Sequence, residues 1–125
     1  MYSVRFYRDK NGKSEIVEFL DRLKERGETS KTDRINRDKI LAYIGALEQY
    51  GTRIGEPVVK HIDGDIWELR PLKNRIFFFY WKDNKFVLLH HFIKKTKKTP
   101  LREIEQARAK MNDFIERHGE QNGKN

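Results

Sequence analysis

The 125-residue sequence contains no cysteine, and this absence excludes several kinds of chemistry. Without thiols the chain has no disulfide bonds, no thiol nucleophile and none of the usual cysteine-containing zinc sites. Long apolar runs are also missing, because the longest, residues 76–81, is far shorter than the roughly 20 residues of a membrane span. The first ten residues lack the apolar segment of a signal peptide. We therefore expect a cytoplasmic protein without a membrane partner.

Motifs for metal binding, phosphate loops and covalent catalysis are missing too. The sequence has no glycine-rich phosphate loop and no serine in a nucleophile elbow. Its four histidines are His61, His90, His91 and His118, and they do not have the spacing of a metal site. Carboxylates are scarce where the aromatics are dense, which makes a two-carboxylate glycosidase a poor candidate. We expect no metal and no cofactor.

Positive charge is concentrated in one stretch of the chain. The formal net charge is +8, yet residues 70–102 hold ten basic residues and a single acid, Asp83, so that the remainder nearly balances. A localised positive patch indicates an anionic partner, of which nucleic acid is the commonest. The alternative is a solvated, charged surface that only aids solubility.

Hydrophobic periodicity predicts a single domain over residues 1–118, followed by a polar tail, 119–125, that we expect to be disordered. The predicted strands cover residues 2–8, 58–62, 66–72, 75–81 and 86–95, and the predicted helices cover residues 14–27, residues 33–50 and a last helix that opens at Thr99 and Pro100. The first two helices form a hairpin on the sheet, and the last three strands form an antiparallel meander. The expected class is α+β, with an antiparallel sheet, an N-terminal helical hairpin and a C-terminal helix.

Basic side chains on the meander are the best candidates for a functional site. Period-two alternation and tight turns can bring Arg70, Arg75, His90 and Lys94 close together. Such a cluster suits RNA cleavage, in which the ribose 2′-hydroxyl attacks the adjacent phosphate and charge builds on its oxygens. Arginine binds those oxygens in bidentate fashion, and a lysine among other cations can carry protons. Nearby aromatics can stack on an unpaired base.

Each of these signals also has a structural interpretation. Arg70 and Arg75 can instead hydrogen-bond a turn, and His91 is better explained as a core histidine than as a catalytic one. The three phenylalanines at 77–79 are more typical of a core than of a stacking platform. The lysines of residues 94–98 can be a phosphate clamp that positions RNA without catalysing its cleavage.

Three segments resemble a known group of proteins. They are DIWELR at residues 65–70, RIFF at 75–78 and LHHFIKKTKKTP at 89–100, and Glu103, Ile104 and Ala107 continue the match. Together they resemble the RelE/ParE toxin superfamily, and most closely its phage-derived Gp49-like branch, which includes HigB toxins. This resemblance implies a RelE-like fold, with a four- or five-stranded sheet and two N-terminal helices packed against it.

The resemblance also implies a function, namely the toxin of a type II toxin–antitoxin system. Such a toxin is an endoribonuclease, or mRNA interferase, that cuts messenger RNA on the ribosome without a metal and so inhibits translation. It implies a cognate antitoxin, usually a helix-turn-helix protein, through which alone operator DNA is contacted. The alternatives are a ParE-like poison of DNA gyrase, because the same fold carries both activities, and a non-catalytic RNA-binding phage accessory protein. The density of arginine and lysine favours the nuclease.

Site residues follow from the resemblance together with the strand pattern. The expected catalytic residues are Arg70, Arg75, His90, Lys94 and Lys95. The expected RNA-binding residues are Lys60, Glu68, Lys73, Phe92, Lys97 and Lys98.

Overall fold

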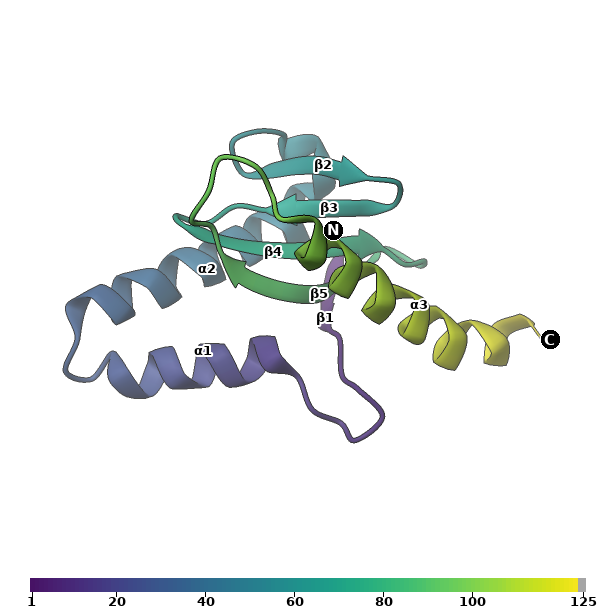
Figure 1. The fold of residues 1–125 in the computed structure, drawn as a ribbon, viewed down its shortest axis with the longest axis horizontal. Helices are drawn as coiled ribbons and strands as arrows, with labels where there is room; N and C mark the ends of the chain where they lie inside the picture. The colour runs from purple at the N-terminus through teal and green to yellow at the C-terminus, as the bar shows by residue number, and fades with distance from the viewer. Residues whose placement is uncertain (124–125) are drawn as a thin grey trace.

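The structure is a computed structural model that describes the backbone of residues 1–123 and the side chains of residues 1–119. Its elements are β1 (Ser3–Phe6), α1 (Glu15–Arg26), α2 (Lys31–Tyr50), the short 3-10 helix η1 (Gly51–Ile54), β2 (Val59–Asp63), β3 (Ile66–Leu69), β4 (Asn74–Tyr80), β5 (Lys85–Ile93) and α3 (Leu101–Gly123) (Figure 1). In this part of the chain the strands form one five-stranded sheet in the order β1-β5-β4-β3-β2. The α+β class and the RelE-like arrangement expected from the sequence are confirmed.

The expected antiparallel meander is present, but the sheet as a whole is mixed rather than antiparallel. Strands β2 to β5 form an antiparallel meander, but β1 pairs with β5 in parallel, with Val4 opposite Phe86. The cause is the helical hairpin, which carries the chain from β1 at one edge of the sheet to β2 at the other. Alternation of apolar residues predicts a strand over residues 2–8, of which Ser3–Phe6 are paired, but it does not specify the partner or the direction of pairing.

Capping residues set the ends of the first two helices, and the observed ends differ only slightly from the predicted ones. The Ser14 hydroxyl accepts a hydrogen bond from the Val17 N–H, and Gly27 follows the last residue of α1. Helix α2 starts two residues earlier than predicted, because the Ser30 hydroxyl caps it by accepting from the Asp33 N–H. Helix α3 starts at Leu101, one residue after Pro100.

Helices cover both faces of the sheet (Figure 1). On one face, α1 and α2 bury apolar side chains that include Leu23 and Leu47 against Phe78 and Leu88. On the other face, the buried residues of α3 are Ala107, Met111 and Phe114, which pack with Phe77, Phe79, Val87, Leu89 and Phe92. The phenylalanines of residues 77–79 are therefore core residues.

Irregular backbone on β4 and β5 sets which residues face α3. The register of these two strands shifts between Phe77 and Phe78, and this leaves Leu89 without a direct partner. As a result Leu89 packs on the α3 side, and His90 also faces α3, whereas His91 stacks on Phe19 of α1. The two adjacent histidines lie on opposite faces, as the sequence predicted.

The C-terminal helix extends to Gly123 and so includes part of the predicted tail, while residues 124 and 125 lie outside the described residues. Arg108 of α3 forms an ion pair with Asp63 at the end of β2. Within residues 1–123, none of the helices has both the length and the apolar character that a membrane crossing requires.

Candidate functional site

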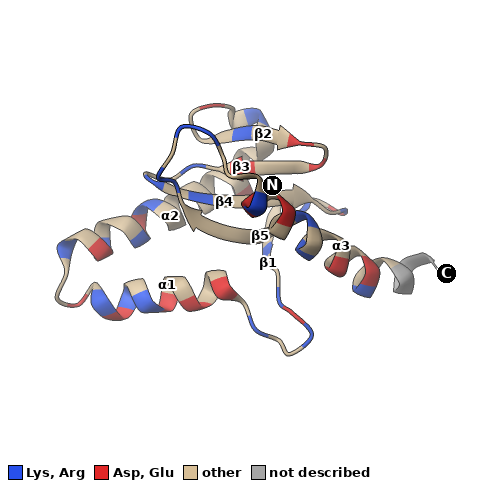
Figure 2. Cartoon of the chain, in the orientation of Figure 1, with Lys and Arg blue, Asp and Glu red and all other residues tan. Residues whose placement is uncertain are grey.

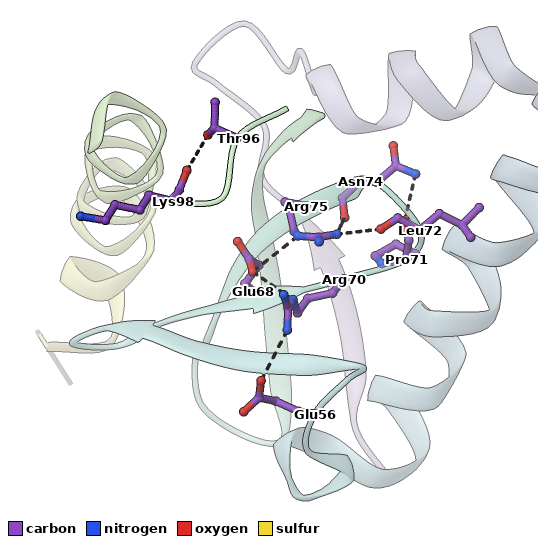
Figure 3. Close-up of polar contacts among 9 residues, drawn as sticks. All are labelled: Glu56, Glu68, Arg70, Pro71, Leu72, Asn74, Arg75, Thr96 and Lys98. Carbon is purple, nitrogen blue, oxygen red and sulfur yellow. Dashed lines mark hydrogen bonds and ion pairs between the residues drawn. The ribbon is translucent and has the colours of Figure 1, made fainter. Parts of the chain in front are cut away.

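A buried carboxylate between two arginines is the centre of the candidate site (Figure 3). Glu68 lies on β3 and is only 1 % exposed. Its Oε1 is 3.4 Å from Nε of Arg70 and 3.7 Å from Nε of Arg75. The two arginine side chains are 21 % and 12 % exposed, so both reach the solvent in part while Glu68 does not. The structure thus brings together three of the residues expected from the sequence.

The turn between β3 and β4 fixes Arg75. Its Nη1 donates hydrogen bonds to the backbone carbonyls of Leu72 and Asn74, both at 2.8 Å. Pro71 interrupts the strand pattern, and Leu72 adopts a left-handed φ of 58°, which ends β3 earlier than predicted. Arg75 therefore hydrogen-bonds a turn, which is the structural alternative given for it in the sequence analysis.

Arg70 is held more loosely. Its Nη1 is 3.4 Å from Oε1 of Glu56, an exposed residue in the loop before β2. Its contact with Glu68 is equally long, and charge-assisted hydrogen bonds are usually 2.7–2.9 Å. Arg70 consequently contributes less to the local structure than Arg75 does.

The electrostatics of the cluster are dominated by burial. Desolvation raises the pKa of Glu68, although the positive charges of Arg75, Arg70, Lys94 and Lys60 act in the opposite direction. Burial also lowers the pKa of Arg75, while Glu68 partly restores it. Among the described residues, Oε2 of Glu68 and both arginine Nε atoms are buried without a hydrogen-bond partner. The cluster is a tight group of charges with net positive sign and unused hydrogen-bonding capacity.

Lysines extend this positive charge along the loop between β5 and α3. The Lys94 N–H donates to the carbonyl of Lys73 at 2.8 Å, which joins the start of this loop to the β3–β4 turn. The Thr96 hydroxyl donates to the carbonyl of Lys98 at 2.7 Å and shapes the rest of the loop. The exposed lysines of this region are Lys60, Lys73, Lys95, Lys97 and Lys98. Figure 2 shows the blue segments that they form along the β3–β4 turn and the loop after β5.

His90 and Phe92 are placed away from the solvent. His90 is 4 % exposed, and its Nε2 lies 2.7 Å from Oε1 of Glu103. Lys110 Nζ lies 2.8 Å from His90 Nδ1, which requires an unprotonated Nδ1 as acceptor, and burial lowers the pKa of His90 in agreement with a neutral ring. Phe92 packs against Phe77 in the core under α3. Both side chains are therefore buried, although Phe92 lies directly opposite Arg75 in the pairing of β4 with β5.

Two residues that organise the site were not predicted. Glu56 pairs with Arg70, as described above. Asn74 is buried, and its Nδ2 donates to Asn36 Oδ1 at 2.7 Å and to the carbonyl of Pro71 at 3.1 Å, which ties the turn to α2. The sequence pattern indicates only that Asn74 belongs to a turn, because asparagine is common in exposed turns as well.

The arrangement is suited to binding a phosphate group. Guanidinium groups recognise phosphate oxygens in bidentate geometry, and ammonium groups add point charges around them. Within the described residues, no three side chains of the His, Asp and Glu types are grouped as metal ligands would be.

The chain matches the model of a known protein family. A family model described as phage-derived protein Gp49-like (DUF891) matches residues 18–112, which is well over half of the chain and includes all of the expected site residues. No curated protein matches the sequence.

Proposed function

The chain belongs to the phage-derived Gp49-like family, which is associated with RelE- and HigB-type toxins, and we propose that it is the toxin of a type II toxin–antitoxin system that cleaves messenger RNA on the ribosome. The observation that supports this proposal is the pair Arg70 and Arg75 around Glu68, next to a loop of exposed lysines.

In the proposed reaction, the ribose 2′-oxygen attacks the neighbouring phosphorus and the 5′-oxygen leaves. Arg70 and Arg75 stabilise the negative charge that develops on the non-bridging oxygens, which is the largest electrostatic requirement of such a step. Of the pair Lys94 and Lys95, one lysine in its neutral form takes the proton from the 2′-hydroxyl, and the other in its protonated form supplies one to the leaving oxygen. Lys60, Lys73, Lys97 and Lys98 contact neighbouring phosphates and position the strand. The product carries a 2′,3′-cyclic phosphate or its hydrolysed form.

The proposed partners are the translating ribosome with its message and a cognate antitoxin. The antitoxin is a helix-turn-helix protein that neutralises the toxin, and operator DNA is contacted only through it. A basic surface of this kind favours association with ribosomal and messenger RNA, because clustered cations accelerate encounter with an anionic partner.

The test is to add the purified chain to ribosomes translating a defined message. We expect cuts that primer extension maps to positions within codons, that survive a chelator when ribosome integrity is checked, and that leave cyclic phosphate ends. Supercoiling by purified DNA gyrase should be unaffected. An intact message, or cleaved DNA in the gyrase reaction, would reject the nuclease in favour of the gyrase poison or the accessory protein.

A further inference from the structure

An apolar groove lies beside the arginine cluster, between α2 and the β3–β4 turn. Its volume is about 510 Å³, and three aliphatic side chains from different parts of the fold line it: Ile35 of α2, Leu72 of the turn and Ile93 at the end of β5. Their exposed fractions are 50 %, 50 % and 48 %. Aliphatic side chains that converge in this way while remaining half exposed are typical of a binding surface.

The backbone at Leu72 is strained to form this groove. Its φ of 58° is in the left-handed region, where a residue with a Cβ is less stable by roughly 1–2 kcal/mol. Glycine or asparagine would adopt this conformation at a lower cost. The leucine side chain gains little from burial in the free protein, because half of it faces the solvent. The turn therefore presents an apolar side chain to water in an unfavourable backbone conformation, an arrangement that is concentrated at functional surfaces.

The rim of the groove is positively charged. Lys73 forms part of the wall, and Lys39 follows Ile35 by about one turn of α2. The acids on this part of α2 are directed elsewhere. Asp33 lies 3.4 Å from Arg26 of α1, and Asp38 lines a separate hollow with Arg34 and Arg37. An apolar floor with a cationic rim complements an apolar side chain flanked by acids.

The floor is poorly suited to a nucleobase. The described residues that line the groove include no aromatic ring on which a base could stack. The two amides in the wall, Asn36 and Asn74, are already hydrogen-bonded to each other. We propose that the groove binds a protein segment that inserts a leucine, isoleucine or phenylalanine side chain and carries aspartate or glutamate beside it.

Such a segment would act on the arginine cluster without entering it. The carbonyls of Leu72 and Asn74, which hold Arg75 in place, belong to the same turn that walls the groove. An occupant that shifts this turn changes the position of the guanidinium group. This regulatory consequence rests on the proposed nuclease function, whereas the binding surface itself does not.

The experiment is to pan a phage-displayed library of random peptides, each about four helical turns long, against the purified full chain. The library is first cleared on the double variant Ile35→Ser/Ile93→Ser. We expect the selected peptides to be enriched in Leu, Ile or Phe next to Asp and Glu. Their dissociation constants should rise about tenfold for Ile35→Ser and for Lys73→Glu, as expected for the loss of one aliphatic or one charged contact.

Leu41→Ser is the matched control, because Leu41 is an exposed aliphatic residue of the same helix that does not line the groove. It should leave binding unchanged, and melting temperatures of all variants show that each is folded. Absence of enrichment, enrichment of basic peptides, or equal binding to the wild type and Ile35→Ser would overturn the proposal. Self-association, or binding of an RNA oligonucleotide, that weakens in Ile35→Ser while peptide binding does not would assign the groove to another occupant.

A selected peptide can then be added to the ribosome assay. Inhibition of cleavage would support the link between groove and arginines. If the chain does not cleave messages at all, the proposed function is rejected, but the binding proposal is still decided by the peptide affinities of the wild type and the variants.

Discussion

Replacement of Arg70 by alanine should separate catalysis from stability. Its two carboxylate contacts are both 3.4 Å long, and one of them is to the exposed Glu56. Loss of the exposed pair with Glu56 costs about 1 kcal/mol or less, and leaving the buried Glu68 with Arg75 alone adds about 1 kcal/mol, which together correspond to a fall in melting temperature of about 6–10 °C for a domain of this size. Removal of a preorganised donor to a developing charge instead costs roughly 100- to 1000-fold in rate.

Arg75→Ala provides the contrast. Arg75 donates two hydrogen bonds at 2.8 Å to turn carbonyls and is less exposed, so the substitution disrupts the turn in addition to leaving Glu68 with a single arginine, as Arg70→Ala also does. We expect a loss of about 2–4 kcal/mol in the free energy of unfolding, because hydrogen bonds from a charged donor contribute more than neutral ones. Cleavage should fall at least as far as in Arg70→Ala, but part of that loss follows from stability.

The measurement pairs urea unfolding with ribosome-dependent cleavage on the same purified variants. Arg53→Ala, which removes an exposed arginine in η1, is the control and should change neither quantity appreciably. A stable Arg70→Ala protein that cuts at the wild-type rate would refute the assignment. Cleavage that falls only in proportion to the unfolded fraction would show that Arg70 has a structural role alone.

Three further outcomes can be checked with the same protein. Burial raises the pKa of Glu68, so its stabilising contribution is present at low pH and is lost as the pH rises. In urea titrations the stability of the wild type relative to Glu68→Gln should therefore decrease as the pH rises above the usual pKa of a glutamate, and an increase would contradict the assigned burial. Burial lowers the pKa of His91 to about 4, so the wild-type protein should lose stability as the pH falls from about 6.5 to about 4. This loss in the free energy of unfolding is on the order of 3 kcal/mol, and it should be absent in His91→Gln. An unchanged pH profile in His91→Gln would exclude the effect. The logarithm of affinity for single-stranded RNA should fall with the logarithm of salt concentration, with a slope of about 0.7 per phosphate contact. Lys97→Ala should reduce that slope. A flat response would show that the basic loop does not bind RNA phosphates.

The sequence was sufficient for features that depend on local patterns. Ser14 and Gly27 set the limits of α1 through capping, which involves only neighbouring residues. The turns of the meander and the opposite faces of His90 and His91 also follow from short-range alternation. The sequence places Glu68 and Arg70 on one face of their strand, but the position of Arg75 beside Glu68 depends on the register between β3 and β4.

Features that depend on distant segments were not predictable in the same way. The direction of β1 is set by the crossover of the helical hairpin, and alternation has the same appearance in parallel and antiparallel strands. The sequence around His90 does not show that α3 covers this histidine with Glu103 and Lys110, because those residues follow later in the chain. The burial of Glu68 depends on the arginines that surround it, and charge in the sequence gives no measure of depth.

The pairing of β1 with β5 has a consequence for how the chain folds as it is synthesised. β1 is the first strand to be made, but its partner residues, Lys85 to Leu88, follow about eighty positions later. All other neighbouring strands are joined by short turns and can pair soon after they emerge, whereas β1 must wait and then close a long loop. A nascent chain that ends before Lys85 lacks the strand that occupies the place between β1 and β4. Premature release during translation therefore yields fragments that cannot assemble this sheet.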